Sequence, residues 1–573
     1  MILPSQISVS FPTAWQLTKP YWYSKNRWKD RVLLVTIVGL ALGQVYISVL
    51  INKWNAAFYD TLQNKNLPQF MHQLGVFSIL AALFIASAVY SQYFTQMLQI
   101  RWRRWMTTSY QNAWLSGHAY YRLQVIYKST DNPDQRIADD IDGFISSTLS
   151  LGIGLLSSVV TLVSFVAILW GLSGTLGFDI DGYHIAIPGY MVWAALLYAI
   201  IGTWLTHKIG RPLVKLNYDQ QRFEANFRYS MVRLRENVEN IAFYKGEPVE
   251  KELLGERFSH ILRNWWQIMK KQKQLNWFTS GYGQIAIIFP VMVAAPRYFA
   301  GAIQLGGLMQ TASAFGSVQG SMSWLINVYP QFANWKATTD RLNDFTAAIR
   351  LSNNDNLRCK ITVRTHGAAS LIINNLTLTL PGGAPLVTHF NLELKPGDRL
   401  LLRGHSGSGK TTLLRALAGL WPYGEGEISL PANAEIMFVP QKPYLPVISM
   451  REIACYPHLP GEYDDGAIAE ALTAVGLETL ASHLDASDNW PQNLSPGEQQ
   501  KIAFARVLLH QPDVVLLDEA SSSLDEAAEA RLYNILTTRL AGAIIISAGH
   551  RNTLKAWHLQ EKFLQCATAA MQP

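Results

Sequence analysis

Cysteine is nearly absent from this 573-residue sequence, which contains only three. Cys359, Cys455 and Cys566 are unevenly spaced and form no CxxC pair, so we expect neither a disulfide framework nor a cysteine-based zinc site. Reduced thiols in a cytosolic domain fit this usage better. A small-residue cleavage site is also missing before the first apolar run, which argues against a removed signal peptide.

Charge is scarce as well, because charged residues make up 16% of the sequence and hydrophobic residues 49%. The formal net charge is +7, and the basic residues stand beside apolar runs rather than in one cluster. A nucleic-acid partner would need basic residues gathered on a folded face, so we expect none. The distribution indicates a membrane protein that continues, from about residue 352, as a soluble α/β domain.

Six apolar runs have the ~20 residues needed to cross a bilayer as a helix, and none contains Asp, Glu, Lys or Arg. They are Val32–Ile51, Gln73–Phe94, Phe144–Trp170, Ile187–Thr206, Trp277–Pro296 and Ile303–Tyr329. Carriers driven by protons or ions usually place a carboxylate or histidine at membrane depth, and these runs lack both. The energy for transport should therefore come from elsewhere in the chain.

The connecting segments differ strongly in basic residues. Arg101–Gly143 and His207–Asn276 are long and rich in Lys and Arg, whereas Lys53–His72 and Gly171–Ala186 are short and carry few. The positive-inside rule places both long loops, the N-terminus and the C-terminal domain in the cytoplasm. Because AAMQP at the C-terminus lacks the S-K-L peroxisomal address, we expect a multi-pass protein of a bacterial plasma (inner) membrane. The aromatic and basic run RWRRW (Arg101–Trp105) predicts an anchor against membrane lipid, with a substrate patch as the alternative.

Two of the apolar runs carry polar stripes at helical spacing. In the third run the stripe is Ser150, Gly154, Ser157, Thr161 and Ser164. In the sixth run it is Gln310, Ser313, Ser317 and Ser321. Such stripes either line a hydrated cavity or allow close helix packing. We favour packing for the third run and leave the sixth open, because Gln310 is large.

The segment GHSGSGKTT fits the pattern G-x-x-x-x-G-K-[ST] between an apolar strand and a helix. In this context backbone N–H groups surround phosphates, Lys410 reaches the β- and γ-phosphates, and the Thr411 hydroxyl ligates Mg²⁺. The residues predicted to hold the phosphates of ATP are Gly404, His405, Ser406, Gly407, Ser408, Gly409, Lys410, Thr411 and Thr412.

Three further segments supply the remaining chemistry of an ATPase. VVLLDEA reads as a buried strand that ends in two carboxylates, with Asp518 holding Mg²⁺ through water and Glu519 acting as the general base. AIIISAGH is a second buried strand, and its His550 is predicted to sense the γ-phosphate. Gln441, in IMFVPQKPY, ends another strand and can bridge Mg²⁺ to the following loop.

These segments, in this order, resemble the nucleotide-binding domain of ABC transporters. The resemblance identifies Leu494–Glu498 as the signature motif and Ser522–Asp525 as the D-loop, and it implies that Ser495, Gly497, Glu498 and Asp525 bind nucleotide. One departure concerns adenine, because the usual stacking aromatic aligns with Leu380. The signature also departs from LSGGQ, since it reads LSPGE. Ser495 as N-cap, Pro496 at the first helical position and Glu498 three residues after the cap form a predicted capping box, so we expect a working variant.

The membrane half narrows the resemblance. TDNPDQRIADDI (Thr130–Ile141) and ENIAFYKGEPVE (Glu239–Glu250) resemble the ABCD fatty-acyl transporters, their SbmA/BacA-like bacterial relatives and, among bacterial half-transporters, the YddA-like group. Asn-Pro breaks a helix and Asp134 could restart one, so we expect a short coupling helix here that rests on the ATPase domain.

The predicted fold is an α-helical six-span transmembrane domain, similar to ABC exporters, fused to an α/β P-loop ABC nucleotide-binding domain. Its expected parts are a membrane domain (1–335), a connecting helix (336–351) and the nucleotide-binding domain (352–573). We expect an ATP- and Mg²⁺-dependent half-transporter that forms a homodimer and moves a peptide or another amphipathic or hydrophilic solute. The alternatives are a fatty acyl-CoA or lipid transporter and an ATP-gated channel or sensor without uphill transport.

Overall fold

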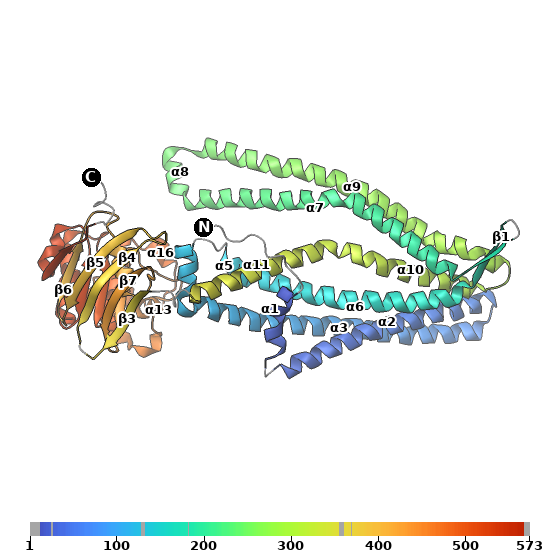
Figure 1. The fold of residues 1–573 in the computed structure, drawn as a ribbon, viewed down its shortest axis with the longest axis horizontal. Coiled ribbons are helices and arrows are strands. Elements are labelled where there is room, and N and C mark those ends of the chain that lie inside the picture. The colour runs from blue at the N-terminus through green and yellow to red at the C-terminus, as the bar shows by residue number, and fades with distance from the viewer. Residues whose placement is uncertain are drawn as a thin grey trace. The chain divides into compact units, whose positions relative to one another are not determined.

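The computed structural model describes residues 12–24, 27–127, 132–180, 183–354, 360–367 and 369–565. The chain divides into two compact units. The first contains Met1–Ala113 and Thr130–Ala347, and the second contains Trp114–Ser129 and Ala348–Pro573. Figure 1 shows that the first unit is built from long helices and the second from sheets with shorter helices.

Among its described residues, the first unit is helical apart from one hairpin. Its helices are α1 (Pro12–Trp22), α2 (Trp28–Gln63), α3 (Leu67–Leu115), α5 (Pro133–Gln135), η3 (Arg136–Asp140), α6 (Ile141–Ser173), α7 (Tyr190–Glu236), α8 (Val238–Tyr244), α9 (Glu247–Phe299), α10 (Leu305–Asn327) and α11 (Tyr329–Asn354). Strands β1 (Thr175–Ile180) and β2 (Tyr183–Pro188) pair antiparallel between α6 and α7. In Figure 1, α7 and α9 run side by side and are joined by the short α8.

Five of the described helices are long and apolar enough to cross a membrane, and four of the six predicted spans fall inside them. The predicted span Ile187–Thr206 begins too early, because Ile187 and Pro188 end strand β2 and helix α7 starts at Tyr190. Few residues in the apolar windows of the five helices are buried within the chain, as expected for surfaces that face lipid. The sixth predicted span, Ile303–Tyr329, forms α10, which is not among these five helices. Its many glycines, serines and other polar residues make α10 less hydropathic, yet it packs against α2, α6, α7 and α9.

The polar stripe of α10 serves helix packing. Gln310 and Asn52 of α2 exchange hydrogen bonds, with Asn52 Nδ2 donating to the Gln310 carbonyl (3.1 Å) and Gln310 Nε2 donating to Asn52 Oδ1 (3.2 Å). Asn52 is 1% exposed, so this pair lies inside the helix interface. On the stripe of α6, a Cβ on Gly154 would stand 2.6 Å from the Trp324 ring, which therefore requires glycine at this position. Small and paired polar residues thus let these helices approach closely.

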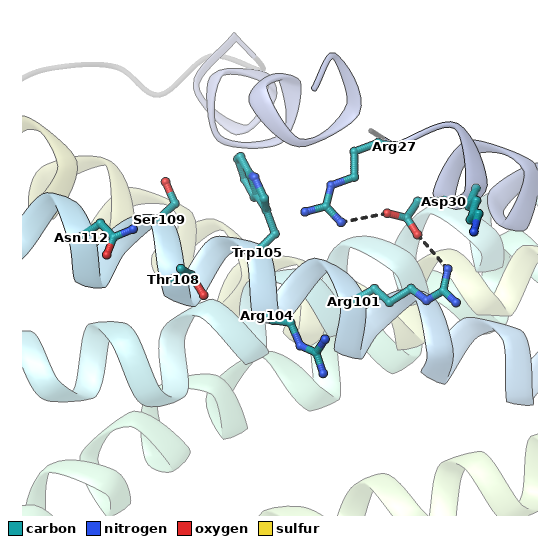
Figure 2. A pocket seen from close by; sticks show the side chains of 9 residues that line it. Arg27, Asp30, Arg101, Arg104, Trp105, Thr108, Ser109 and Asn112 are labelled. Carbon is teal, nitrogen blue, oxygen red and sulfur yellow. Dashed lines mark hydrogen bonds and ion pairs between the residues drawn. The ribbon is translucent and has the colours of Figure 1, made fainter. Parts of the chain in front are cut away.

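The RWRRW run is part of a joint between α1 and α3. Trp102 is 1% exposed and stacks on Tyr21 of α1 with ring centroids 5.2 Å apart, so it faces protein rather than lipid. The buried carboxylate of Asp30 accepts hydrogen bonds from Tyr21 Oη (2.8 Å), Arg27 Nη1 (3.2 Å) and Arg101 Nη1 (3.2 Å). Figure 2 shows Arg27 and Arg101 pointing toward Asp30, whereas Arg104 points away.

The chain breaks at Asn132-Pro133, as the sequence predicts, although the residue that starts the next helix differs. Asn132 precedes the helix with φ 44°, and Pro133 occupies its first turn. Asp134 is therefore inside the helix and does not cap it. The segment that belongs with the second unit is Trp114–Ser129, which comes just before the predicted coupling helix at Thr130–Ile141. Thr130 and Asp131 lie outside the described residues.

The second unit contains two sheets. A parallel five-stranded sheet has the order β11-β6-β10-β9-β8, and a four-stranded sheet has the order β3-β7-β4-β5. The strands are β3 (Lys360–His366), β4 (Leu371–Thr379), β5 (Pro385–Leu394), β6 (Arg399–Arg403), β7 (Gly424–Pro431), β8 (Ile436–Val439), β9 (Val514–Asp518), β10 (Ile544–Ala548) and β11 (Gln560–Phe563). Every residue of β9 and β10 is buried, which explains their unbroken apolar sequences.

The second unit also contains helices. They are η1 (Ser116–His118), α4 (Ala119–Tyr121), η2 (Arg122–Tyr127), α12 (Lys410–Leu417), α13 (Met450–Cys455), η5 (Pro460–Glu462), α14 (Asp465–Ala474), α15 (Glu478–Ala481), α16 (Trp490–Asn493), α17 (Pro496–His510), α18 (Glu526–Arg539) and η6 (Asn552–Trp557). Of these, α12, α17 and η6 contact strands of the parallel sheet. Cys455 is a buried free thiol, and Cys359 and Cys566 lie outside the described residues.

Replacing Asp30 by alanine should destabilise the first unit, because it leaves Tyr21 Oη and two guanidinium groups without their shared acceptor. The arginine side chains are 24% and 44% exposed, so water compensates in part, and we expect a loss of about 1–3 kcal/mol in the free energy of unfolding. Asp142→Ala is the matched control, because Asp142 also pairs with an arginine but is 37% exposed. Unfolding in one detergent measures both variants, and equal losses would contradict the role of Asp30.

Candidate ATP-binding site

The glycine-rich loop joins the end of β6 to the start of α12. Gly407 and Gly409 have φ angles of 81° and 95°, which side-chain-bearing residues rarely adopt. A Cβ on Gly409 would also stand 2.9 Å from the Val387 side chain. The buried Ser408 hydroxyl has no hydrogen-bond partner among the described residues. A glycine-rich loop with an unpaired buried hydroxyl at a helix N-terminus is suited to bind phosphates.

Lys410, the first residue of α12, points into this loop. Its ammonium group donates to the carbonyls of Gly404 (2.8 Å) and His405 (3.2 Å) and lies 3.1 Å from His550 Nε2. Burial lowers the pKa of Lys410, and the nearby carboxylates of Glu519 and Asp518 oppose this shift. A cation held by carbonyls inside a phosphate-binding loop can exchange these acceptors for phosphate oxygens.

The two carboxylates follow one another at the end of β9 but have different surroundings. Asp518 is buried and accepts a hydrogen bond from the Thr411 hydroxyl (3.0 Å). Burial raises the pKa of Asp518, and the Thr411 hydrogen bond works against that rise. Glu519 is more exposed, accepts from Gln441 Nε2 (3.2 Å) and lies 3.5 Å from His550 Nε2. One carboxylate is thus held beside the loop while the other stays open to water.

The structure therefore brings six of the predicted residues together from separate elements: Lys410, Thr411, Gln441, Asp518, Glu519 and His550. His405 and Ser406 are exposed on the loop, Gly404 precedes it, and Thr412 lies in the first turn of α12. Leu380, predicted near the adenine base, follows β4 and is 43% exposed.

The signature motif lies at the N-terminus of α17, where the predicted capping box is confirmed. Ser495 Oγ accepts from the Glu498 backbone N–H (3.3 Å), and the Glu498 carboxylate accepts from the Ser495 backbone N–H (2.9 Å). These bonds from Ser495 lower the pKa of Glu498. Pro496 occupies the first helical turn, where its missing N–H is not needed. The proline variant thus has a regular helix N-terminus.

The D-loop, Ser522–Asp525, precedes α18. Its Asp525 caps this helix by accepting a hydrogen bond from the Ala528 N–H (2.6 Å). A Cβ on Gly497 would stand 3.3 Å from the Ser523 carbonyl, so the signature and the D-loop are in contact. In the described part of the chain, no hydrogen bond or ion pair joins Ser495, Gly497, Glu498 or Asp525 to the cluster around Lys410.

Sequence motifs did not reveal Gln500, which connects these regions. Its side chain is 1% exposed, and its Nε2 donates to the Gln441 carbonyl (3.0 Å) and Ser522 Oγ (3.2 Å). Its Oε1 accepts from the Ser523 N–H (3.0 Å). Gln500 thus joins the signature helix to the Gln441 loop and the D-loop. The only signal in the sequence was a glutamine two residues after the motif.

Two arginines, Arg551 and Arg506, also lie outside the recognised sequence motifs and were not predicted from the sequence. Arg551, next to His550, donates to the carbonyls of Leu524 (2.7 Å) and Ser522 (2.9 Å) and fixes the D-loop. Arg506 donates from the middle of α17 to the carbonyls of Ile453 (2.7 Å) and Tyr444 (3.0 Å). Burial lowers the pKa of Arg506 to about 10, which still leaves it charged at neutral pH.

Comparison with known proteins supports this site. Residues 17–299 match the family "ABC transporter transmembrane region 2", and residues 387–522 match "ABC transporter". An uncharacterized ABC transporter ATP-binding protein of Haemophilus influenzae is 38% identical over 96% of this chain and 92% of its own length. The chain belongs to the ABC transporter family.

Other relatives of this ABC transporter confirm the resemblance to YddA and the ABCD group. The inner membrane ABC transporter ATP-binding protein YddA of Escherichia coli is 35% identical, with 95% of each chain covered. The human lysosomal cobalamin transporter ABCD4 is 27% identical over 94% of this chain and 91% of its own. A solved bacterial Atm1-family ABC exporter with ATP bound shares the fold, with a TM-score of 0.69, 16% identity and 93% of each chain covered. The chain is thus an ABC-type ATPase coupled to membrane transport.

Replacing Pro496 by glycine should change ATP hydrolysis by this ABC transporter only a few-fold. Ser495 Oγ, the Gly497 N–H and the capping box remain, while the added chain freedom should cost about 1 kcal/mol of stability. Ser495→Ala is the contrasting variant, because it removes the cap and a hydroxyl at a similar cost of about 1 kcal/mol, and we expect it to slow hydrolysis more. ATPase assays and thermal unfolding measure both. A rise by orders of magnitude in Pro496→Gly would show that proline impairs the motif.

Proposed function

We propose that the protein is a homodimeric half-transporter whose two ATP molecules bind between the subunits. The observation that carries this is the cluster of Lys410, Thr411, Asp518, Glu519 and His550, which gathers the predicted phosphate-binding and hydrolysis residues but not the signature motif of the same chain. The first N–H groups of the helix that begins after Ser495 have no acceptor within the helix, so a phosphate can accept hydrogen bonds from them. A second copy would supply this helix N-terminus, so that each ATP contacts Lys410 of one subunit and Ser495 of its partner.

Thr411, Asp518 and Gln441 are the residues that would hold Mg²⁺. They offer hydroxyl, carboxylate and amide oxygens, the hard ligands that Mg²⁺ prefers, and the hydroxyl and carboxylate already lie within 3.0 Å of each other. When bound, Mg²⁺ supplies positive charge against the phosphates. Glu519 is the proposed general base, since its carboxylate stays accessible to water and is held between Gln441 and His550.

The segment Trp114–Ser129 is proposed to transmit the ATPase cycle to the membrane helices. It continues α3 and belongs to the compact unit of the ATPase. Arg122 is buried there and donates to the Ser352 carbonyl (2.7 Å). Tyr121 is close enough to feel the charge of Arg415, which lies on α12, the helix that begins with Lys410. A shift of α12 on phosphate binding would therefore act on the end of α3.

We infer that α10 is the sixth span. Its 23 residues are about 35 Å long, which is enough to cross the hydrocarbon core, and it packs against four of the five apolar helices. Six spans keep both chain ends and the basic loops on one side, in the cytoplasm of a bacterial cell. We keep the division into a membrane domain (1–335), a connecting helix (336–351) and a nucleotide-binding domain (352–573) as part of this proposal.

The proposed substrate is a peptide or another amphipathic or hydrophilic solute. The predicted spans carry no ring of acidic or basic residues that would select a charged cargo, so the proposal rests on the relatives of this chain. A relative named for cobalamin points the same way. The test is uptake by ATP-loaded proteoliposomes of peptides, cobalamin and fatty acyl-CoA. Accumulation of acyl-CoA alone would indicate a lipid transporter, and hydrolysis without any accumulation would indicate a channel or sensor.

Replacing Glu519 by glutamine should lower ATP hydrolysis at least ~100-fold while ATP binding persists, because a general base typically contributes 10²- to 10⁴-fold. ATP should then hold the variant as a dimer, which light scattering in detergent can measure. Glu478→Gln is the matched control, since Glu478 is exposed on α15 outside the cluster. Hydrolysis at the wild-type rate would refute Glu519 as the base, and a monomer with bound ATP would refute the shared site.

A further inference from the structure

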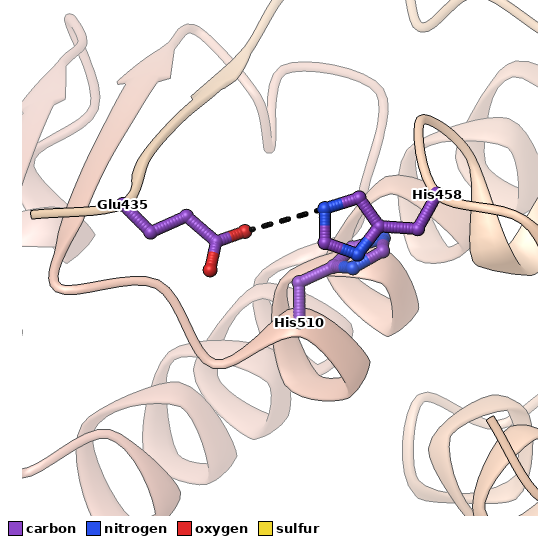
Figure 3. A group of neighbouring side chains, drawn as sticks. All are labelled: Glu435, His458 and His510. Atoms are coloured by element: carbon purple, nitrogen blue, oxygen red, sulfur yellow. Dashed lines mark ion pairs between the residues drawn. The ribbon is translucent and has the colours of Figure 1, made fainter. Parts of the chain in front are cut away.

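Three metal-binding side chains from distant parts of the sequence meet away from the ATP cluster. Glu435 precedes β8, His458 follows α13, and His510 is the last residue of α17. Each can offer one ligand atom, and these three atoms lie within 4.8 Å of one another. His458 Nε2 is 3.8 Å from Glu435 Oε1, and the two imidazole rings are 4.6 Å apart at 74°. Figure 3 shows Glu435 directed at His458, with the His510 ring beside it.

Both histidine rings are oriented by hydrogen bonds to neighbouring groups. His510 Nε2 is 3.2 Å from the Tyr456 carbonyl, which can only accept, so Nε2 carries the proton and Nδ1 is a free base. His510 Nδ1 therefore accepts from the Tyr463 hydroxyl (2.6 Å). Because the hydroxyl has one proton, the contact between its oxygen and His458 Nδ1 (2.8 Å) makes His458 Nδ1 the donor.

The neutral tautomer of His458 thus has a lone pair on Nε2, the nitrogen that faces Glu435. The Glu462 carboxylate, 3.5 Å from His458 Nδ1, supports the same tautomer. Histidines that bind metals usually donate their other N–H to a carbonyl, carboxylate or hydroxyl in this way. The backbone of Glu435 is also fixed, because its N–H donates to Asp513 (2.9 Å) and its carbonyl accepts from the Val514 N–H (3.1 Å).

We propose that Glu435, His458 and His510 form a binding site for a divalent transition metal, with Zn²⁺ as the best match. Two imidazoles and one carboxylate are a common zinc ligand set, whereas Mg²⁺ and Ca²⁺ prefer oxygen alone. Zinc would displace the Tyr463 hydroxyl from His510 Nδ1, and water would complete the coordination. Ligand atoms around zinc lie about 3.3–3.6 Å apart, so the side chains need to close by little more than an ångström.

The site is accessible and its ligands come from three elements. The side chains of Glu435 and His458 are 48% and 37% exposed, which gives the ion an entry path. Bound zinc would tie the end of α17 to the start of β8 and to the segment after α13. Because α17 begins with the signature motif, zinc should also slow ATP hydrolysis, a consequence that rests on the proposed function.

Zinc binding is tested on the full-length, tag-free protein in detergent by competition with a chelating dye. We expect one high-affinity Zn²⁺ per chain, with the affinity at least tenfold weaker in His458→Gln and in Glu435→Gln. His483→Gln is the matched control, because His483 is exposed in the same domain but outside the cluster. Zinc should raise the melting temperature of the wild type and the control but not of the two ligand variants. Equal affinity in all four proteins, or no stoichiometric binding, would overturn the site.

The effect on activity has a separate outcome. Saturating zinc should slow ATP hydrolysis severalfold in the wild type and in His483→Gln, and should leave His458→Gln and Glu435→Gln unaffected. If zinc binds with the expected dependence on Glu435 and His458 but hydrolysis does not change, the site stands and its link to the signature helix is wrong. If neither the wild type nor any variant hydrolyses ATP in the absence of zinc, the proposed function is wrong. The binding assay then still decides whether the zinc site exists.

Discussion

The parallel register of β6, β10 and β9 is the constraint on which the ATP site depends. Ala548 pairs with Leu402 on one side and with Asp518 on the other, so the three strands end at the same edge of the sheet. The residues that follow them are the glycine-rich loop, Glu519 and the Gly549-His550 turn. Parallel strands present their carboxyl ends together, and ligands of open α/β sheets bind there. A shift of this register would separate Lys410 from His550 and Thr411 from Asp518.

Buried polar side chains extend this fixed edge to the signature helix. Gln500 satisfies both ends of its amide with Gln441, Ser522 and Ser523, and Arg551 holds the D-loop through two carbonyls. A buried amide that loses one partner costs about 1–3 kcal/mol, so these segments cannot shift independently at little cost. The N-terminus of α17 and the D-loop are therefore held together, and Gln500 links both of them to the Gln441 loop. Such a connected network suits a switch biased by the γ-phosphate.

Sequence alone predicted the ATP cluster well and the connections around it poorly. The glycine-rich loop, the two buried strands and the Ser495 capping box follow from spacing over a few residues, and local sequence determines them. Gln500 and Arg551 carry no such pattern, because their roles depend on partners 22 to 59 residues away. Trp102 was predicted to contact lipid, but it stacks on Tyr21 of α1. The local sequence is the same for a tryptophan at the membrane interface and for one packed against another helix. The coupling helix expected at Thr130–Ile141 stays a prediction, and the Asn-Pro break gave no sign that the preceding segment, Trp114–Ser129, groups with the ATPase unit.

In the first unit, the predicted spans contain polar but no charged residues, and several of these polar residues bond to other side chains or to the backbone. Asn52 and Gln310 satisfy one another between α2 and α10, and Ser317 and Ser321 donate to carbonyls one turn earlier in their own helix. Such pairs allow α10 to be less hydropathic than its neighbours, because they are enclosed by those neighbours rather than by lipid. They also offer no group that changes protonation at neutral pH. Because the predicted spans hold no Asp, Glu, Lys, Arg or His, the ATPase domain is the feature of this chain that can drive movement of its helix bundle.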